Sequence, residues 1–265
     1  MTGSGNDFVM LDGRVHRVAD WPVDRIVAVC DRRNGVGADG FAVLTPLAPG
    51  QVRMSFFNSD GSEAAMCGNA ALCSTVLATT LGMAGPDGIR LVTGAGTFPT
   101  RRTGDAEASL NLPDFLAPRD PGIARGPGEL AIWLTTVGVP HLTVLVQDVE
   151  KIDLAGRGRE LRFHPGAGSA GANVNFVAAV IEGDGSRWLM RTYERGVEGE
   201  TLACGTGAVA SAVALGGAGR GSLPAQIVCR GGRTLEIRAV LGANQASQVW
   251  LSGEGRLVFR GTLSD

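Results

Sequence analysis

Two similar stretches, one in each half of the chain, constrain the fold more than any other feature of the sequence. The first spans residues 58–73 and the second spans residues 194–207, and each contains a Cys-Gly pair, at Cys67 and at Cys204. Each stretch follows an apolar run typical of a strand and leads into small residues that favour a helix. The pattern therefore predicts a strand, a loop and a helix in each half, with a cysteine where each helix begins.

Two more landmarks recur at nearly the same separation. Asp7 and His141 are 134 residues apart, as are Ala38 and Ala172, and the two cysteines are 137 residues apart. Matched landmarks at one offset indicate two copies of one structural unit. Because duplicated units usually pack about a pseudo-twofold axis, we expect the cysteines to face each other across a cleft between two similar domains, where ligand sites commonly lie.

The segments between these landmarks predict an α+β fold. Short apolar runs follow the first cysteine helix, which favours a sheet-rich domain with one main helix. Residues 113–128 hold four prolines among glycines and charges, and are the best candidate for a linker. We expect an N-terminal domain over residues 1–112, completed by a C-terminal strand over residues 256–265, and a C-terminal domain over residues 113–255.

The composition argues against several kinds of partner. With 265 residues, a formal net charge of −2 and no basic run, the chain is not expected to bind nucleic acid. No apolar run approaches the ~20 residues that span a bilayer, and the start has no signal-peptide pattern, so we expect a soluble, cytoplasmic protein without a membrane partner. The five cysteines and three histidines show no metal-ligand spacing, so we expect reduced thiols and no metal.

Cofactor chemistry is also not expected. A pyridoxal-phosphate enzyme needs a lysine for its Schiff base, and the single lysine, Lys151, lies in a segment that predicts a solvated turn. No GxxxxGK[ST] motif for nucleotide phosphates occurs. We therefore expect chemistry carried out by side chains alone, on a small-molecule partner.

Two opposed thiols suit proton transfer at a carbon centre. A helix start leaves backbone N–H groups unpaired and carries the positive end of the helix dipole, so it binds anions and lowers the pKa of a thiol placed there. Near neutral pH one thiolate can remove a proton from one face of the carbon while one thiol returns a proton to the other face. Amides at the two helix starts would stabilise the carboxylate beside the developing carbanion.

Eight segments together resemble one known family, the diaminopimelate epimerases, over nearly the whole chain. Taken together they are highly specific, although no single segment would be. The segments are Gly5–Phe8, Gly35–Gly40, Asn58–Glu63, Met66–Asn69, Gly138–His141, Asn173–Phe176, Tyr193–Gly196 and Glu200–Gly207. The resemblance implies a cofactor-independent isomerase that interconverts L,L- and meso-diaminopimelate for lysine and cell-wall synthesis. It also implies two domains, each a β-barrel-like sheet wrapped round a central helix, and a homodimer.

The resemblance further implies roles for individual residues. Cys67 and Cys204 would be the acid/base pair. Four residues at the helix starts would hold the reacting carboxylate, and five polar residues would hold the substrate's ammonium group and distal end. The carboxylate ligands are Gly68, Asn69, Gly205 and Thr206, and the remaining ligands are Asn6, Asn58, Asn173, Glu194 and Arg195.

Three other polar residues keep two interpretations each. His141, between Pro140 and an apolar run, is either a structural hydrogen-bonding residue or a residue that lines the site. Glu63 and Glu200 each lie four residues before a cysteine, and they are interpreted as capping or polarising groups.

Departures from the family pattern leave alternative functions open. Ala70 stands where the family has a glycine, Leu72 where it has an arginine, and Val139 where it has an asparagine that would contact the distal carboxylate. A racemase of another amino acid, such as histidine, or a phenazine-pathway type of isomerase therefore fits as well. A third hypothesis is a non-catalytic amino-acid-binding or redox protein, in which Cys67 and Cys204 form a reversible disulfide.

Overall fold

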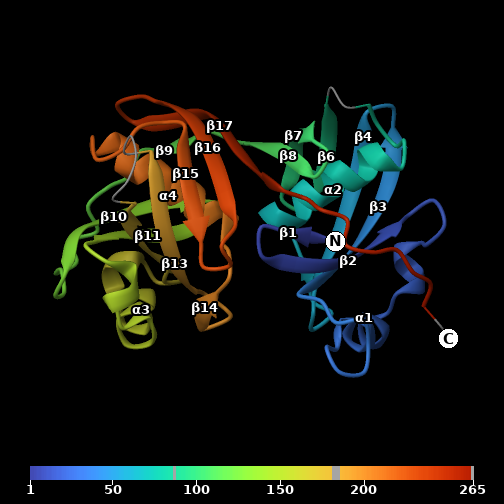
Figure 1. Cartoon of the computed structure of the whole chain (residues 1–265), viewed down its shortest axis with the longest axis horizontal. Helices are drawn as coiled ribbons and strands as arrows, with labels where there is room; N and C mark the ends of the chain where they lie inside the picture. The colour runs from blue at the N-terminus through green and yellow to red at the C-terminus, as the bar shows by residue number, and fades with distance from the viewer. Residues whose placement is uncertain (86–87, 181–185, 264–265) are drawn as a thin grey trace. The chain divides into compact units, whose positions relative to one another are not determined.

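The computed structural model describes residues 1–85, 88–180 and 186–263, and the chain folds into two compact units. Unit 1 comprises Met1–Asn111 and Ser252–Asp265, and unit 2 comprises Leu112–Leu251. Each unit is sheet-rich and has one long helix, α2 in unit 1 and α4 in unit 2 (Figure 1).

The sheet of unit 1 mixes parallel and antiparallel neighbours. β2 is antiparallel to the short β1 and parallel to β3; β4 is antiparallel to β3 and β5 and parallel to β6; and β7 is antiparallel to β6 and β8. Crossovers thus link β2 to β3 through α1 and β4 to β6 through α2. The strands are β1 (Thr2–Gly3), β2 (Asn6–Asp12), β3 (Gly40–Ala48), β4 (Gln51–Asn58), β5 (Glu63–Ala64), β6 (Ile89–Thr93), β7 (Gly96–Gly104) and β8 (Glu107–Leu112).

Unit 2 repeats this order of pairing. β11 is antiparallel to β10 and parallel to β12; β13 is antiparallel to β12 and β14 and parallel to β15; and β16 is antiparallel to β15. The prediction of two copies of one unit is therefore confirmed by strand pairing. The strands are β9 (Phe115–Leu116), β10 (Glu129–Val137), β11 (Val139–Val146), β12 (Asn173–Ala179), β13 (Arg187–Glu194), β14 (Gly199–Thr201), β15 (Ala225–Cys229) and β16 (Thr234–Leu241), followed by β17 (Gln245–Glu254), whose residues from Ser252 onward belong to unit 1.

The two long helices are the buried centres of their units. In α2 (Gly68–Thr80) every residue from Asn69 to Ala78 is buried, and in α4 (Gly205–Gly217) every residue from Gly207 to Leu215 is buried. A helix that is apolar on all sides is typical of a position enclosed by other elements. α2 contacts β1, β4, β6 and β7, and α4 contacts β10, β11, β12, β15 and β16, so each sheet wraps round its helix as predicted.

Two shorter helices lie in crossover connections between parallel strands. The apolar residues of α1 (Val23–Cys30) have helical spacing, but α3 (Leu154–Arg162) has glycines inside it that hide its pattern. The Asp153 side chain accepts a hydrogen bond from the Gly156 amide and begins α3. Gly158 is required by packing, since a Cβ there would lie 2.8 Å from the Cβ of Tyr193. The described residues also form three 3₁₀ turns: η1 (Val18–Asp20), η2 (Val149–Lys151) and η3 (Pro165–Ala167).

The C-terminal strand differs from the prediction. We expected it over residues 256–265, but the strand is β17, which ends at Glu254, and residues 257–263 have no regular structure. Gly255 interrupts the strand, because its backbone lies so close to α2 that a Cβ would be 2.8 Å from the Leu72 carbonyl oxygen. Only Arg256 continues the pairing, through a single bridge to Thr2, and the last two residues of the predicted strand lie outside the described part of the chain.

Candidate active site

Cys67 caps the start of α2, as the sequence predicts. Its backbone is extended, with φ −135° and ψ 119°, and its side chain is half-buried. Gly68 and Asn69 are the first two helical residues, so their amides belong to the group that an α-helix leaves without intrahelical partners. Unit 1 therefore presents a thiol beside amides that have no intrahelical partner, which is an arrangement suited to an anionic ligand.

The Asn69 side chain is held by an amide chain. Its Nδ2 donates to Asn6 Oδ1 at 2.7 Å, and Asn6 Nδ2 donates to Asp39 Oδ2 at 3.0 Å. Because the Asp39 carboxylate accepts here, both amide groups have a defined orientation. These hydrogen bonds leave Asn69 Oδ1 buried with no partner among the described residues, so this oxygen can accept a hydrogen bond from a ligand.

An ion cluster that the sequence did not predict holds the Asp39 end of these hydrogen bonds. Arg32 donates to both carboxylate oxygens of Asp7 at 2.8 Å and to Asp39 at 2.6 Å. The Arg32 hydrogen bonds hold the pKa of Asp7 below its usual value. Arg32 and Asp39 lie in the glycine-rich turn before β3, but no pattern in the sequence indicates that this turn lies beside Asp7 on β2.

Cys204 caps α4 in nearly the same conformation, with φ −135° and ψ 105°. It is only 7% exposed. Burial raises the pKa of its thiol, and the nearby Glu194 carboxylate raises it further, whereas the Gly207 amide and the Thr206 hydroxyl lower it. The expectation that a helix start lowers the thiol pKa is therefore wrong for Cys204, because loss of hydration outweighs the donors.

His141 is completely buried in unit 2 and belongs to the same constellation as Cys204. Its Nε2 lies 3.0 Å from Thr206 Oγ1, and Thr206 Oγ1 lies 3.8 Å from Cys204 Sγ. Burial lowers the pKa of His141 to about 3, and the Arg195 charge contributes, so the ring is neutral at physiological pH. Both interpretations of His141 thus keep support, since the residue is hydrogen-bonded and close to a predicted ligand.

Three further predicted ligands gather at the β12–β13 end of unit 2. Asn173 Oδ1 accepts from the backbone amide of Arg195 at 2.7 Å, which ties β12 to the turn after β13. Glu194, the last residue of β13, is half-buried, and burial raises the pKa of its carboxyl. The structure therefore brings Asn173, Glu194 and Arg195 together through the pairing of β12 with β13.

The two upstream glutamates do not cap the helices. Glu200 on β14 forms a bidentate ion pair with Arg191 at 2.7 and 2.9 Å, and Glu63 is exposed on β5.

Asn58 is exposed at the end of β4, where its Nδ2 donates to Ser62 Oγ at 3.0 Å. Among the residues that depart from the family pattern, Ala70 and Leu72 are fully buried in the core around α2, and Val139 is half-buried at the start of β11.

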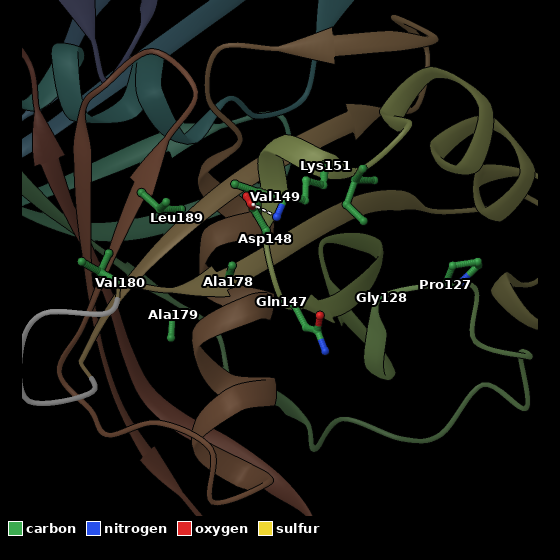
Figure 2. Close-up of a pocket in the computed structure, with 11 residues that line it drawn as sticks. Pro127, Gly128, Gln147, Asp148, Val149, Lys151, Ala178, Ala179, Val180 and Leu189 are labelled. Atoms are coloured by element: carbon green, nitrogen blue, oxygen red, sulfur yellow. Dashed lines mark ion pairs between the residues drawn. The ribbon is translucent and has the colours of Figure 1, made fainter.

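A cavity of about 680 Å³ in unit 2 contains none of the predicted site residues (Figure 2). Its walls are mainly aliphatic and include Val149, Ala178 and Leu189. Its charged side chains, Asp148 and Lys151, lie 3.5 Å apart as an ion pair. Because the two charged side chains pair with each other and no predicted site residue lines the cavity, the helix starts are the better candidates for chemistry.

The fold is shared with known proteins of related architecture. A phenazine biosynthesis protein of the PhzF family from Bacillus anthracis superposes with a TM-score of 0.68 at 11% identity, covering 96% of this chain and 92% of that one. A hydroxyproline epimerase from Agrobacterium vitis superposes with a TM-score of 0.62 at 19% identity, covering 96% and 86%. The chain therefore has the two-unit fold of this class of proteins.

Sequence comparison is more specific. The diaminopimelate epimerase family model matches residues 1–110 and 133–246. A diaminopimelate epimerase of Gemmatimonas aurantiaca is 43% identical, covering 100% of this chain and 98% of that protein, and one of Aquifex aeolicus is 36% identical, covering 100% and 96%. The chain belongs to the diaminopimelate epimerase family and is an isomerase, which confirms the resemblance.

No helix among residues 1–85, 88–180 and 186–263 is long and apolar enough to cross a membrane.

Proposed function

We propose that this chain epimerises L,L-diaminopimelate to meso-diaminopimelate, with Cys67 and Cys204 as the acid/base pair. The observation that carries the proposal is the duplicated cap: each cysteine is the N-cap of a buried thirteen-residue helix, and the two backbones have almost the same φ and ψ. Family membership supplies the substrate. The product would serve lysine and cell-wall precursor synthesis, and we propose a homodimer as the assembly.

The proposed reaction needs no cofactor. The thiolate of one cysteine takes the proton from the α-carbon, and the electron pair of that C–H bond is delocalised into the adjacent carboxylate. The thiol of the other cysteine then gives its proton to the opposite face of the carbon, so one proton enters and one leaves. The roles exchange in the reverse direction, because the two groups are chemically equivalent.

The side chains suggest which residues bind which group of the substrate. Backbone amides of Gly68 and Gly205 would hold the reacting carboxylate as the negative charge grows. The side chain of Asn69 is suited to an ammonium group, since its oxygen is a buried acceptor without a partner in the described chain. Glu194 and Arg195 would recognise the distal ammonium and carboxylate groups.

The test is proton NMR of L,L-diaminopimelate with freshly reduced protein in D2O. Loss of the α-proton signal together with appearance of the meso form is expected. Cys67→Ala and Cys204→Ala should each lower the rate by about 10²–10⁴-fold, the range for loss of a general acid or base. Cys30→Ala is the matched control, because Cys30 is a buried thiol on α1 remote in sequence from both caps.

Other outcomes would redirect the proposal. Exchange with histidine but not with diaminopimelate would establish a racemase with altered substrate choice, for which Val139 is the remaining motivation because Ala70 and Leu72 are fully buried. Binding of the amino acid without solvent exchange, unchanged by a reductant, would favour the non-catalytic hypothesis. Full activity in both cysteine variants would refute the two-thiol mechanism.

A further inference from the structure

A line of buried polar side chains in unit 2 leads from the sheet to Cys204. Asn175 lies on β12, next to Thr143 on the parallel strand β11 and opposite Thr192 on the antiparallel strand β13. His141 lies two residues before Thr143 and shares its face of β11. All four of these side chains are at most 2% exposed, so each polar atom must find a partner within the protein.

The orientation of the Asn175 amide follows from its neighbours. Asn175 Nδ2 lies 3.3 Å from the backbone carbonyl oxygen of Leu142, and a carbonyl oxygen only accepts. The group facing Leu142 must therefore be the NH2 group. The Thr192 hydroxyl agrees with this orientation, since it donates to Asn175 Oδ1 at 3.0 Å.

The amide in turn selects one tautomer of His141. The same Asn175 Nδ2 lies 3.3 Å from His141 Nδ1, which must accept and therefore carries no proton. A neutral imidazole then carries its proton on Nε2 and donates it to Thr206 Oγ1, 3.0 Å away. Once Thr206 Oγ1 accepts from the ring, its own hydrogen is free to point at Cys204 Sγ, at 3.8 Å.

We propose that Asn175 is a positioning residue for Cys204: through His141 it directs the Thr206 hydroxyl at the sulfur and so stabilises the thiolate. This rests on the proposed acid/base role of Cys204. Gly207 is part of the arrangement, because a Cβ at this position would overlap Asn175 Oδ1 and lie 3.1 Å from Cys204 Sγ. We call the series of hydrogen bonds from Asn175 through His141 and Thr206 to Cys204 the relay. The Thr206 hydroxyl forms a stronger hydrogen bond with a charged thiolate than with a neutral thiol, so the relay favours the thiolate.

The first test needs no substrate. NMR of protein labelled with ¹⁵N-histidine distinguishes the two ring nitrogens, and the chain has only three histidines, so His141→Gln assigns the signals. We expect Nε2 to be protonated and Nδ1 unprotonated between about pH 6 and 8, since the group titrates far below this range. A proton on Nδ1 in the wild-type protein would overturn the inference.

Asn175→Asp tests the cause of the tautomer. A carboxylate only accepts, so His141 Nδ1 should become protonated in this variant. The matched control is Thr143→Val, which removes a buried hydroxyl on the neighbouring strand and should leave the tautomer unchanged, because the contact of Thr143 is with Ser211. An unprotonated Nδ1 in folded Asn175→Asp protein would refute the proposed cause.

The link to catalysis is tested by a double-mutant cycle on epimerisation. Thr206→Val keeps the backbone amide but removes the hydroxyl, and we expect kcat/KM to fall about 10–100-fold, as for loss of one hydrogen bond to a charged group. Thr206→Ser should recover most of this loss. In the Thr206→Val background, Asn175→Asp should lower kcat/KM by less than about a further threefold, since both substitutions act through the same hydroxyl.

The outcomes separate this inference from the proposed function. Additive losses in the cycle, or no difference between Thr206→Val and Thr206→Ser, would overturn the relay. If Asn175→Asp does not fold, the tautomer of His141 in the wild-type protein and the comparison of Thr206→Val with Thr206→Ser still test the proposal. The NMR experiment is independent of turnover, so a protein without epimerase activity would refute the proposed function and leave the tautomer to be judged by itself.

Discussion

Acidification from pH 7 to pH 5 should destabilise unit 2 through His141. The ring is fully buried, and burial lowers its pKa to about 3 in the folded protein, whereas a histidine in an unfolded chain titrates near ~6.5. Between these values the unfolded state binds one more proton than the folded state. The contribution of His141 to stability is therefore fully present above pH ~6.5 and is lost as the pH falls toward 3.

The size of the effect follows from the two pKa values. The folded ring stays neutral at pH 5 while the unfolded ring is almost fully protonated, so about 2 kcal/mol of unfolding free energy should be lost between pH 7 and pH 5. Further loss is expected toward pH 3.

Urea denaturation followed by tryptophan fluorescence measures this loss. Trp133, Trp188 and Trp250 belong to unit 2 and only Trp21 belongs to unit 1, so the signal reports mainly on the unit that contains His141. The wild type should lose about 2 kcal/mol more than His141→Gln between pH 7 and pH 5, because the variant has no ring to protonate.

The control is His16→Gln, which removes an exposed histidine of unit 1 and should keep the pH dependence of the wild type. A gap between wild type and His141→Gln that stays constant from pH 7 to pH 5 would refute the neutral buried ring on which the relay depends.

Three substitutions test buried contacts of the two units, each by urea denaturation. Gly207→Ala should cost about 1–3 kcal/mol, since the new methyl group overlaps the Asn175 side chain in a filled core. Leu72→Ala should cost about 2–5 kcal/mol, because Leu72 is completely buried on α2 and its loss leaves a cavity. Glu129→Ala should cost about 3 kcal/mol, since the Glu129 carboxylate is 1% exposed and pairs with Arg157 at 2.7 Å.

Leu116→Ala is the control for these substitutions, because Leu116 is 78% exposed and should change the free energy of unfolding by less than about 0.5 kcal/mol. A Leu72→Ala variant as stable as the control would mean that this side chain does not pack in the core.

Much of the fold was predictable because the repeated unit uses strong local signals. The strands before each cysteine loop have apolar runs, and the two cysteine helices consist of small and apolar residues whose preference does not depend on distant contacts. α3 was missed because its two interior glycines weaken the helical pattern, while the packing of Gly158 against Tyr193 selects glycine there. The C-terminal strand was misplaced because Leu257–Phe259 are apolar and yet exposed, and no local rule shows that the backbone at Gly255 must pass close to α2.

The candidate site was predictable only where chemistry and spacing coincide. Cys67 and Cys204 were identified as helix caps because a cysteine followed by glycine and small residues marks a helix start. The pKa of Cys204 was predicted with the wrong sign, since burial is a property of the folded unit and outweighs the helix donors. Asn175 was missed because its importance depends on register: strand pairing places it opposite Thr192, and its side chain reaches His141 on the neighbouring strand.

The sequence by itself determined the duplicated architecture, the family and the two cysteines, because these depend on residue type and on spacing along the chain. Only the tertiary structure decided the hydrogen-bond partners, the burial of His141 and Cys204, and the direction of their pKa shifts. Those properties arise when strands far apart in sequence come into register around a helix, which removes water from polar groups and fixes which atom donates and which accepts.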